Sequence, residues 1–178
     1  MNCELCILDN VLPTAEGAIA LAIEESDGVL AEALVLLIGY GRVSQALAPR
    51  LAPLAGELCI TNRGSERLKL AAQAGYSTVV WQDWPAIAEK ATYLFNTVPD
   101  LVLPRNILEI LRPDVLIIDL AAHPGGVDFV QAKQLRIKAI LASGLPGRYA
   151  PIAAGKTLAR VYPPLLAAKL EERGKWDD

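Results

Sequence analysis

The sequence reads ALVLLIGYGRVS from Ala33 to Ser44. Its first half is a short apolar run of the kind that forms a buried parallel strand. Its second half has the spacing Gly39-x-Gly41-x-x-Ser44 ahead of a helix-forming segment. A strand, a glycine turn and a helix in this order are typical of a dinucleotide-binding unit, here with Ser44 in place of the third glycine. Gly39 would permit the tight turn, and Gly41 would let the backbone approach a pyrophosphate at the start of the helix.

The rest of the chain alternates strand and helix signals. Apolar runs predict strands at residues 34–38, 57–61, 77–81, 93–96, 115–119 and 138–142. Helices are predicted at residues 43–55, 65–74, 84–90, 104–111, 127–135 and 153–172, with one more starting at about Pro13. About six strands that alternate with helices predict a Rossmann-type doubly wound parallel sheet in three αβα layers. This context favours the dinucleotide interpretation over a glycine turn that only joins a strand to a helix.

Three positions carry specific expectations about the helices. Thr14 is expected to cap the first helix, after an extended lead-in over residues 1–11. Pro49 is expected to break the helix that follows the glycine turn, because an interior proline costs about 3 kcal/mol. Gly56 is expected to end that same helix.

Composition limits the class of protein. The chain has 178 residues, enough for one domain, and a net charge of −3. Buried parallel strands explain its hydrophobic fraction of 53%, since no apolar run approaches the roughly 20 residues that span a bilayer. Because the net charge is negative, the chain has no excess of basic residues to attract nucleic acid. We therefore expect no nucleic acid as a partner, and the lack of a long apolar run makes us expect no membrane either. An odd number of cysteines without a secretory signal favours the cytoplasm, and Cys3-x-x-Cys6 is interpreted as two small apolar residues.

The residues after the second predicted strand bear on which dinucleotide is bound. An acidic residue about 20 positions beyond the glycine turn binds the ribose hydroxyls and favours NAD, but here the chain reads Asn62-Arg63-Gly64-Ser65. Arg63 offers a fork of donors that matches a 2′-phosphate, to which Asn62, Ser65 and Arg42 would add donors. The sequence therefore predicts NADP(H) as the preferred cofactor, with NAD(H) as the open alternative.

The other strand ends supply further candidates, because this fold binds its ligand at the carboxyl edge of the sheet. Thr97 is a candidate hydroxyl donor to the nucleotide, with plain turn chemistry as the alternative. Asp119 is expected to hold a loop through backbone N–H groups rather than to catalyse. His123 is a candidate proton carrier or anion ligand, and Arg148, in a glycine-rich loop, is a candidate to hold a carboxylate. For both, an exposed side chain without a role is the alternative.

Five segments of the chain occur in a specific order. They are 13–19, 39–42, 96–99, 118–121 with 124–126, and 144–147 with 150–151. Together they resemble the A-subunit family of dipicolinate synthase, over residues 10–166. The resemblance implies an NAD(P)-dependent oxidoreductase that makes pyridine-2,6-dicarboxylate, a spore constituent, from a dihydrodipicolinate precursor. It also implies that the protein works with a flavoprotein-like B subunit.

The resemblance assigns roles to individual residues. The cofactor residues are Gly39, Tyr40, Gly41, Arg42, Val43, Ser44, Asn62, Arg63, Ser65, Thr97, Val98, Pro99, Gly144 and Pro146. Thr14 and Glu16 fall on a helix that faces the substrate cleft. His123 and Arg148 are the cations near the predicted site, and they are the candidate catalytic residues for a dicarboxylate substrate. No metal ion is expected there.

The chain departs from the family on the substrate side. Members of the family carry an N-terminal substrate domain ahead of the Thr14 segment, whereas this chain starts just before that segment. We therefore expect one NAD(P)-binding Rossmann domain over residues 1–178, without catalysis by this chain alone. Ala122 stands where a serine is expected, His123 where a lysine is common, and Ala153 where a small hydroxyl residue is expected.

Two alternatives stay open at this point. One is a stand-alone NAD(P)-binding module without catalysis, and the other is a reductase akin to the 2-hydroxyacid dehydrogenases. The first and last helices are apolar enough to pack on another copy of the chain or on the absent domain, so a homodimer is possible.

Overall fold

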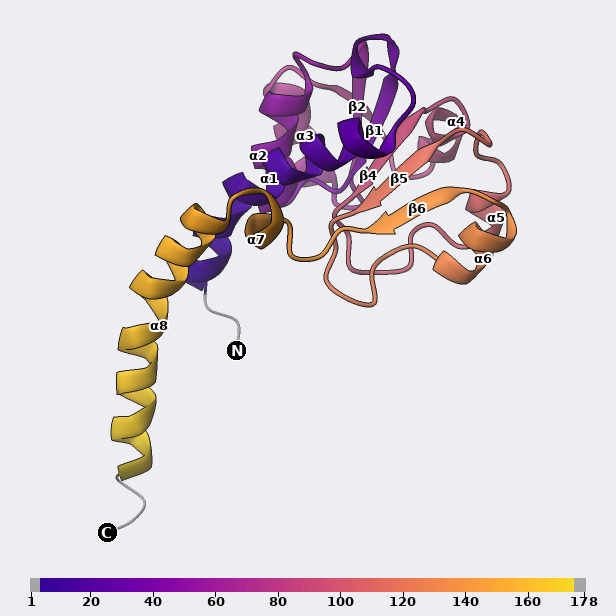
Figure 1. Ribbon diagram of the computed structural model, residues 1–178. Helices are drawn as coiled ribbons and strands as arrows, with labels where there is room; N and C mark the ends of the chain where they lie inside the picture. The colour runs from indigo at the N-terminus through magenta and orange to yellow at the C-terminus, as the bar shows by residue number, and fades with distance from the viewer. Residues whose placement is uncertain (1–3, 175–178) are drawn as a thin grey trace.

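The computed structural model describes residues 4–174 of the chain, and it describes the side chains of residues 10–164, 166 and 167. Cys3 lies outside the described residues, and the side chain of Cys6 lies outside the described side chains. The fold is built on a six-stranded parallel sheet with the strand order β3-β2-β1-β4-β5-β6 (Figure 1). The predicted Rossmann-type α/β class is confirmed.

The strands have the positions that the apolar runs indicated. They are β1 (Leu34–Ile38), β2 (Glu57–Thr61), β3 (Ser77–Val79), β4 (Tyr93–Asn96), β5 (Leu116–Asp119) and β6 (Lys138–Leu141). The ranges predicted for β1, β2 and β4 match residue for residue. β1 pairs with both β2 and β4, so the strand order reverses beside β1. Ligands in such sheets bind outside the carboxyl ends of the strands at this reversal.

Helices cover both faces of the sheet. They are α1 (Glu4–Glu25), α2 (Arg42–Leu51), α3 (Ser65–Gln73), α4 (Trp84–Ala88), α5 (Arg105–Leu108), α6 (Phe129–Gln134), α7 (Leu145–Tyr149) and α8 (Pro151–Gly174), with the short 3₁₀ turn η1 (Leu30–Glu32). Side chains alternate along β1: Val35 and Leu37 join the core under α1, α2, α3 and α7, while Leu36 and Ile38 join the core under α4, α5 and α6. The two faces therefore have separate apolar cores.

Several expectations about the helices are wrong. α1 already runs from Glu4 and continues through Pro13, so the predicted extended lead-in is helical where it is described. Thr14 lies inside this helix, and its hydroxyl donates to the Asn10 carbonyl, 2.6 Å away, instead of capping. This bond within one turn is a common use of a threonine hydroxyl inside a helix.

The helix after the glycine turn also differs from its prediction. α2 continues past Pro49, and the Ala52 N–H still bonds to the Ala48 carbonyl at 2.9 Å, so a single proline does not break it. Gly56 is not its end, because α2 stops at Leu51. Gly56 instead leads into β2, where a Cβ would lie 2.8 Å from the Ala31 carbonyl.

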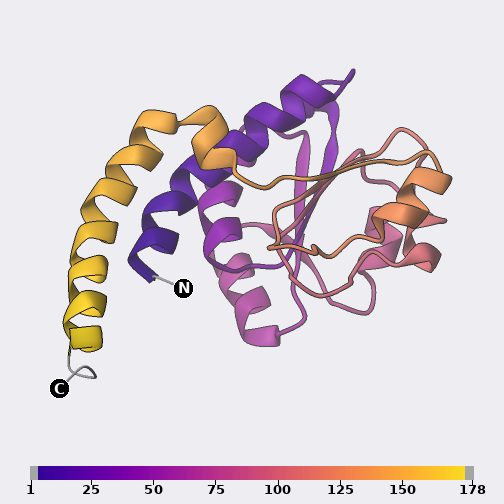
Figure 2. The ribbon, with the colours of Figure 1, turned by 60° about the horizontal axis from the view of Figure 1, so that its bottom comes forward.

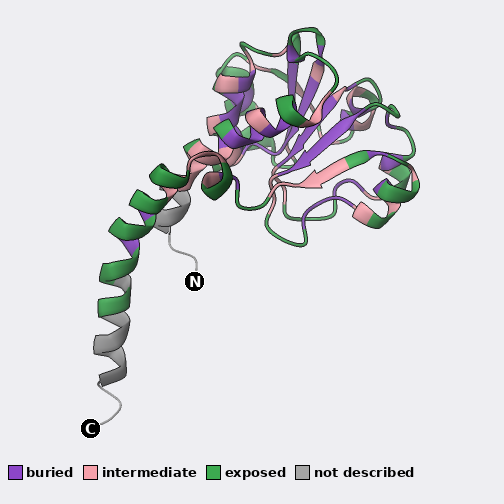
Figure 3. Ribbon diagram, viewed as in Figure 1, coloured by how far each residue is buried: buried purple, intermediate pink, exposed green. Residues whose placement is uncertain are grey.

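The chain ends in a long helix that projects from the sheet. α8 passes Pro163 and Pro164 without a break and lies beside the first turns of α1, as Figures 1 and 2 both show. Much of its described surface is exposed (Figure 3). In the part of the chain that the structure describes, no helix is both long and apolar enough to cross a bilayer.

Candidate dinucleotide site

The glycine turn lies at the carboxyl end of β1. Gly39 has a φ of +96°, and a Cβ there would overlap the Thr97 hydroxyl. Gly41 is the N-cap of α2 and provides no side-chain cap, so the first N–H groups of this helix are available to an anion. Next to Gly41, the Arg67 guanidinium comes close, with Nη1 3.3 Å from the position of a Cβ. Each glycine thus occupies the backbone position for which the sequence pattern requires it.

A cavity of about 560 Å³ lies beside this turn, at the carboxyl ends of β1, β2 and β4. Its walls combine the glycine turn, the β2–α3 loop and the loop after β4. They are formed by Gly39, Tyr40, Gly41, Asn62, Gly64, Ser65, Glu66, Arg67, Thr97, Val98 and Pro99. Three segments that the sequence analysis chose separately therefore meet around one space. Burial, and then the neighbouring Tyr76, raise the pKa of the Tyr40 hydroxyl, which keeps this side chain neutral.

Six predicted cofactor residues do not line this cavity. They are Arg42, Val43, Ser44, Arg63, Gly144 and Pro146. Arg42 and Val43 begin α2 behind the glycine turn. Gly144, with a φ of +71°, is the N-cap of α7, and Pro146 is in the first turn of that helix, after the carboxyl end of β6. The glycine-rich segment predicted to bind the cofactor is thus the start of a short helix.

A second cavity of about 560 Å³ lies at the opposite, amino edge of the sheet. Its walls include Ser26, Tyr93, Asp114 and Lys138. Ligands of this fold bind at the carboxyl edge, and the glycine turn lies there too. The cavity beside the glycine turn is therefore the candidate dinucleotide site.

Asn62 ties the β2–α3 loop to the glycine turn. Its side-chain oxygen accepts the Tyr40 N–H at 3.0 Å, and its amide nitrogen donates to the Gly64 carbonyl at 2.9 Å. Both ends of the amide are therefore engaged within the fold. The side chain sets the distance between two walls of the cavity. The predicted role of Asn62 as a phosphate donor stays a prediction.

Thr97 joins β4 to β1 and α2. Its hydroxyl donates to the Ile38 carbonyl at 3.0 Å and lies 2.8 Å from the hydroxyl of Ser44, which is fully buried. Ser44 can donate to Thr97, because Thr97 already gives its proton to Ile38. This arrangement fits the turn-chemistry alternative for Thr97, and it explains a serine at the third glycine position. A contact between Thr97 and a nucleotide stays a prediction.

The two arginines of the β2–α3 segment point to different places. Arg63 lies outside the cavity, with Nη1 3.3 Å from Oδ2 of Asp100 and its guanidinium carbon 5.4 Å from the ring centroid of Trp81. Arg67, which the sequence analysis missed, lines the cavity and has Nη1 3.3 Å from the Tyr40 carbonyl oxygen. Its spacing of four residues from Arg63, at the start of a predicted helix, is the signal that could have identified it.

Glu66 is a second residue that the sequence analysis missed. It lines the cavity, so a carboxylate is present near the site after all. Its side chain is 85% exposed, and its Oε1 lies 3.2 Å from Nζ of Lys69. Exposure and this neighbour weaken its repulsion of a phosphate.

The expectation that Asp119 holds a loop is confirmed. Its buried carboxylate accepts hydrogen bonds from the Asn96 side-chain amide at 2.9 Å, from the Ala121 N–H at 3.0 Å and from the Gly126 N–H at 2.6 Å. We call these four residues the Asp119 network. His123 lies on the loop that this network closes, and its side chain is exposed and outside the cavity. Its catalytic role stays a prediction.

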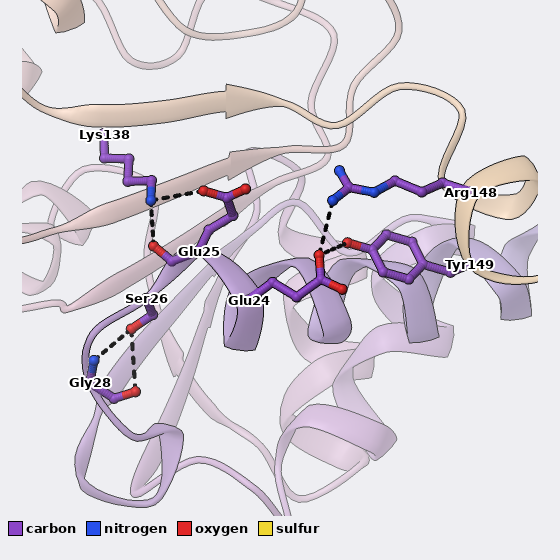
Figure 4. A network of polar contacts seen from close by, with 7 residues as sticks. All are labelled: Glu24, Glu25, Ser26, Gly28, Lys138, Arg148 and Tyr149. Carbon is purple, nitrogen blue, oxygen red and sulfur yellow. Dashed lines mark hydrogen bonds and ion pairs between the residues drawn. The ribbon is translucent and has the colours of Figure 1, made fainter.

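Arg148 belongs to a different set of residues (Figure 4). Its Nη2 lies 2.9 Å from Oε2 of Glu24, and the Tyr149 hydroxyl donates to the same oxygen at 2.6 Å. The next residue, Glu25, lies 2.8 Å from Nζ of Lys138, the first residue of β6. We call these five residues the Glu24 network. It joins the end of α1 to α7 and β6, and it does not contribute to the cavity beside the glycine turn.

The pKa values of two residues in the Glu24 network shift in opposite directions. The hydrogen bond and the charge of Lys138 lower the pKa of Glu25. Burial and the hydrogen bond to Glu24 raise the pKa of the Tyr149 hydroxyl. Both shifts favour the protonation states that the contacts of Figure 4 require at neutral pH.

The two predicted substrate-side residues lie on α1. Glu16 is 66% exposed, and its Oε1 lies 3.5 Å from Nε of Arg50 on α2. Thr14 uses its hydroxyl within its own helix. Neither residue lines the cavity beside the glycine turn, and their roles toward a substrate stay predictions.

Comparison with known proteins supports the resemblance to the dipicolinate synthase A subunit. No family model matches the chain. The A subunit of dipicolinate synthase from Bacillus subtilis (strain 168) is 36% identical over 166 residues, covering 93% of this chain and 56% of that protein. The crystal structure of the same subunit from Bacillus halodurans gives a TM-score of 0.85 at 36% identity, covering 92% and 56% of the two chains. The crystal structure from Bacillus subtilis gives a TM-score of 0.86 at 34% identity, covering 96% and 57%.

A more distant structure shows the fold alone. The transhydrogenase from Sinorhizobium meliloti has a TM-score of 0.76 at 15% identity, covering 93% of this chain and 56% of that one. The chain spans about half the length of the relatives it matches. Over that length, the resemblance that the five sequence segments indicated is confirmed: the chain is a close homologue of the dipicolinate synthase A subunit.

Proposed function

We propose that this chain is the NADP(H)-binding domain of a dipicolinate synthase-like oxidoreductase. The observation that carries the proposal is the cavity at the carboxyl ends of β1, β2 and β4, with the glycine turn and the uncapped start of α2 in its wall. The homology to dipicolinate synthase supports the reaction class. The reaction would convert a dihydrodipicolinate precursor to pyridine-2,6-dicarboxylate.

The residues present fit a dinucleotide. The open N–H groups at the start of α2 would hold the pyrophosphate beside Gly41, and Asn62 keeps the adenosine side of the cavity at a fixed width. Val98 and Pro99 form the wall at the end of β4, on the side toward the nicotinamide. When bound, the nicotinamide supplies the hydride transfer. This chain binds and orients that ring.

The substrate and the partners rest on the homology. The chain spans about half the length of its relatives, so we assign much of the dicarboxylate pocket to a substrate domain, and residues 1–178 to one NAD(P)-binding domain. The relative is named as one subunit of its enzyme, which supports a partner B subunit. We also propose that the protein acts in the cytoplasm of a spore-forming organism and that it forms a homodimer.

One observation favours a second candidate function. The candidate catalytic residues His123 and Arg148 both lie outside the cavity, and Arg148 is paired with Glu24. A nucleotide-binding module without catalysis would have this arrangement. Hydride transfer from a dihydrodipicolinate, measured after adding a substrate domain or a B subunit, separates the two functions.

Calorimetric titration of the chain with NADPH and NADH tests the proposal. In Gly41→Val, the new side chain would occupy the pyrophosphate position, so we expect affinity for both nucleotides to fall more than about tenfold, the change that 1.4 kcal/mol produces. Gly41 has a φ of −87°, which valine adopts without strain, so the fold should persist. Gly155→Ala is the matched control, because a Cβ there meets no atom of the described side chains or backbone within 4 Å. Absence of binding to the unmodified chain at millimolar nucleotide would refute the proposal.

A further inference from the structure

Arg63 and Arg67 are four residues apart, and both are candidates to bind a 2′-phosphate. Arg63 immediately follows Asn62, the position from which this fold contacts the adenosine ribose. Arg67 is in the first turn of α3. Sequence position therefore favours Arg63, and only the structure distinguishes the surroundings of the two guanidinium groups.

Arg63 is held away from the cavity. Asp100 pairs with its guanidinium at 3.3 Å, and the Trp81 ring lies beneath it at 5.4 Å. To reach a ligand, Arg63 would have to give up the ion pair and the ring contact together. Both contacts come from loops at the carboxyl edge, after β3 and β4, so they hold the guanidinium against those loops, and Arg63 does not line the cavity.

The Arg67 guanidinium lies between two walls of the cavity. It extends from α3 to the glycine turn, where Nη1 is 3.3 Å from the Tyr40 carbonyl and 3.3 Å from the position of a Cβ on Gly41. The adenosine ribose of a bound dinucleotide lies between the glycine turn and the end of the second strand. The guanidinium therefore occupies the region that the ribose 2′ position would face.

The charge of Arg67 is available to a ligand. Among the residues that the structure describes, no carboxylate forms an ion pair with it; its recorded hydrogen bond goes to a backbone carbonyl. The adjacent Glu66 pairs with Lys69 instead. A guanidinium has five donors in a planar fork, so the contact with Tyr40 leaves donors for a phosphate.

We infer that Arg67, rather than Arg63, recognises the 2′-phosphate and makes the site selective for NADP(H) over NAD(H). The inference rests on the proposed function, since it names the specificity-determining residue of that site. Ser65 and the start of α3, which has no side-chain cap, lie beside the same position and complete the donor set. Asn62 acts as a positioning residue that keeps α3 at this distance from the glycine turn.

Calorimetric titration of four proteins with NADPH and NADH tests the inference. The proteins are the unmodified chain and its Arg67→Gln, Arg67→Lys and Arg63→Gln variants, and the two nucleotides differ only in the 2′-phosphate. A hydrogen bond to a charged group contributes about 1.5–3 kcal/mol, so Arg67→Gln should weaken NADPH binding about 10–100-fold and leave NADH within about threefold. The affinity of Arg67→Lys for NADPH should lie between those of the unmodified chain and Arg67→Gln, because lysine keeps the positive charge but lacks the planar fork of donors. Arg63→Gln should change the affinity for either nucleotide by no more than about threefold. Thermal unfolding checks that each variant is folded.

Each other outcome overturns the inference in a recognisable way. If Arg63→Gln removes the NADPH preference and Arg67→Gln keeps it, Arg63 leaves Asp100 and is the specificity residue. If Arg67→Gln weakens NADPH and NADH equally, Arg67 contacts a part common to both nucleotides. If the unmodified chain binds both nucleotides equally, the site does not recognise the 2′-phosphate. In these three cases the proposed function stands. Only when the unmodified chain binds neither nucleotide does the proposed function fail as well.

Discussion

Two polar networks flank the last strands of the sheet, and they differ in their access to water. The Asp119 network is buried, and its carboxylate accepts from two backbone N–H groups and one side-chain amide. The Glu24 network is built from side chains that are largely exposed, with Arg148 at 55%. Buried polar groups cost free energy when they lose a partner, whereas exposed ion pairs contribute little. We therefore expect the first network to stabilise the fold and the second to contribute far less stability.

Asp119→Ala should have the largest effect. It removes the acceptor of three hydrogen bonds, two of them buried, from Asn96 and Gly126, and one partly buried, from Ala121, while Asn96 keeps its bond to the Val98 carbonyl. Since each buried group without a partner costs about 1–3 kcal/mol, we expect the free energy of unfolding to fall by at least about 3 kcal/mol. Urea denaturation measures it. A loss below about 1 kcal/mol would show that water reaches this network and would remove the contrast with the Glu24 network.

Gly126→Ala is expected to have the next largest effect. A Cβ on Gly126 would lie 2.6 Å from the Asp100 carbonyl and 2.7 Å from the Val98 carbonyl, and would overlap the Asn96 amide. Backbone atoms cannot move aside cheaply, so the free energy of unfolding should fall by about 2–3 kcal/mol. Gly147→Ala in α7 is the matched control, because a Cβ there meets no atom of the described residues within 4 Å. It should be neutral or slightly stabilising. If both variants lost the same free energy of unfolding, close packing around Gly126 would not be the cause of the loss.

The strands and the glycine turn could be predicted because their signals are local. An apolar run such as 34–38 followed by Gly39 specifies a buried strand and a turn without knowledge of the rest of the chain. The three loops around the cavity could be predicted from the rule that ligands bind at the carboxyl edge. Thr97 and Pro99, which the sequence placed at this edge, lie in the cavity wall.

The side-chain partners could not be predicted, because they come from distant parts of the sequence. Arg148 pairs with Glu24, 124 residues away, and Arg63 pairs with Asp100, 37 residues away. Arg67 reaches the cavity only because Asn62 fixes α3 against the glycine turn. Sequence patterns indicate which segments carry function, but contacts between segments that are distant in the sequence determine which arginine is available to a ligand.

Arg148→Met should have a small effect on stability. It removes an exposed ion pair with Glu24 and the contact of the guanidinium with the Tyr149 ring at 4.9 Å. Exposed pairs contribute about 0.2–1 kcal/mol, so the loss should stay below about 1 kcal/mol in urea denaturation. The methylene stem of methionine keeps the packing of the arginine stem. A loss above about 2 kcal/mol would place Arg148 among the residues that hold the fold and end the contrast between the networks.

The smallest expected effect is a change in the pH dependence of stability at Glu25. Lys138 lowers the pKa of Glu25 in the folded chain below its ordinary value of 4.5. A carboxyl group with a depressed folded pKa stabilises the fold above its ordinary pKa, and this contribution is lost as the pH falls through the folded pKa. Lys138→Met removes the largest cause of the shift and leaves the smaller effect of the Arg148 charge, so the melting temperature should fall less steeply below about pH 4.5 in this variant than in the unmodified chain.

Thermal unfolding from pH 7 to pH 3 measures this difference, and the other carboxylates of the two proteins cancel when the curves are subtracted. Arg112 lowers the pKa of Asp114 in both proteins. The contribution of Asp114 to the pH dependence therefore also cancels when the curves are subtracted. Because the Glu25 pair is exposed, salt should screen it, and the difference should shrink as the ionic strength rises. A difference that salt leaves unchanged would mean that water does not reach the pair, so the Glu24 network would resemble the Asp119 network after all. A difference that vanishes with salt identifies this end of α1 as a solvated surface, where an arginine such as Arg148 can exchange its partner at little cost.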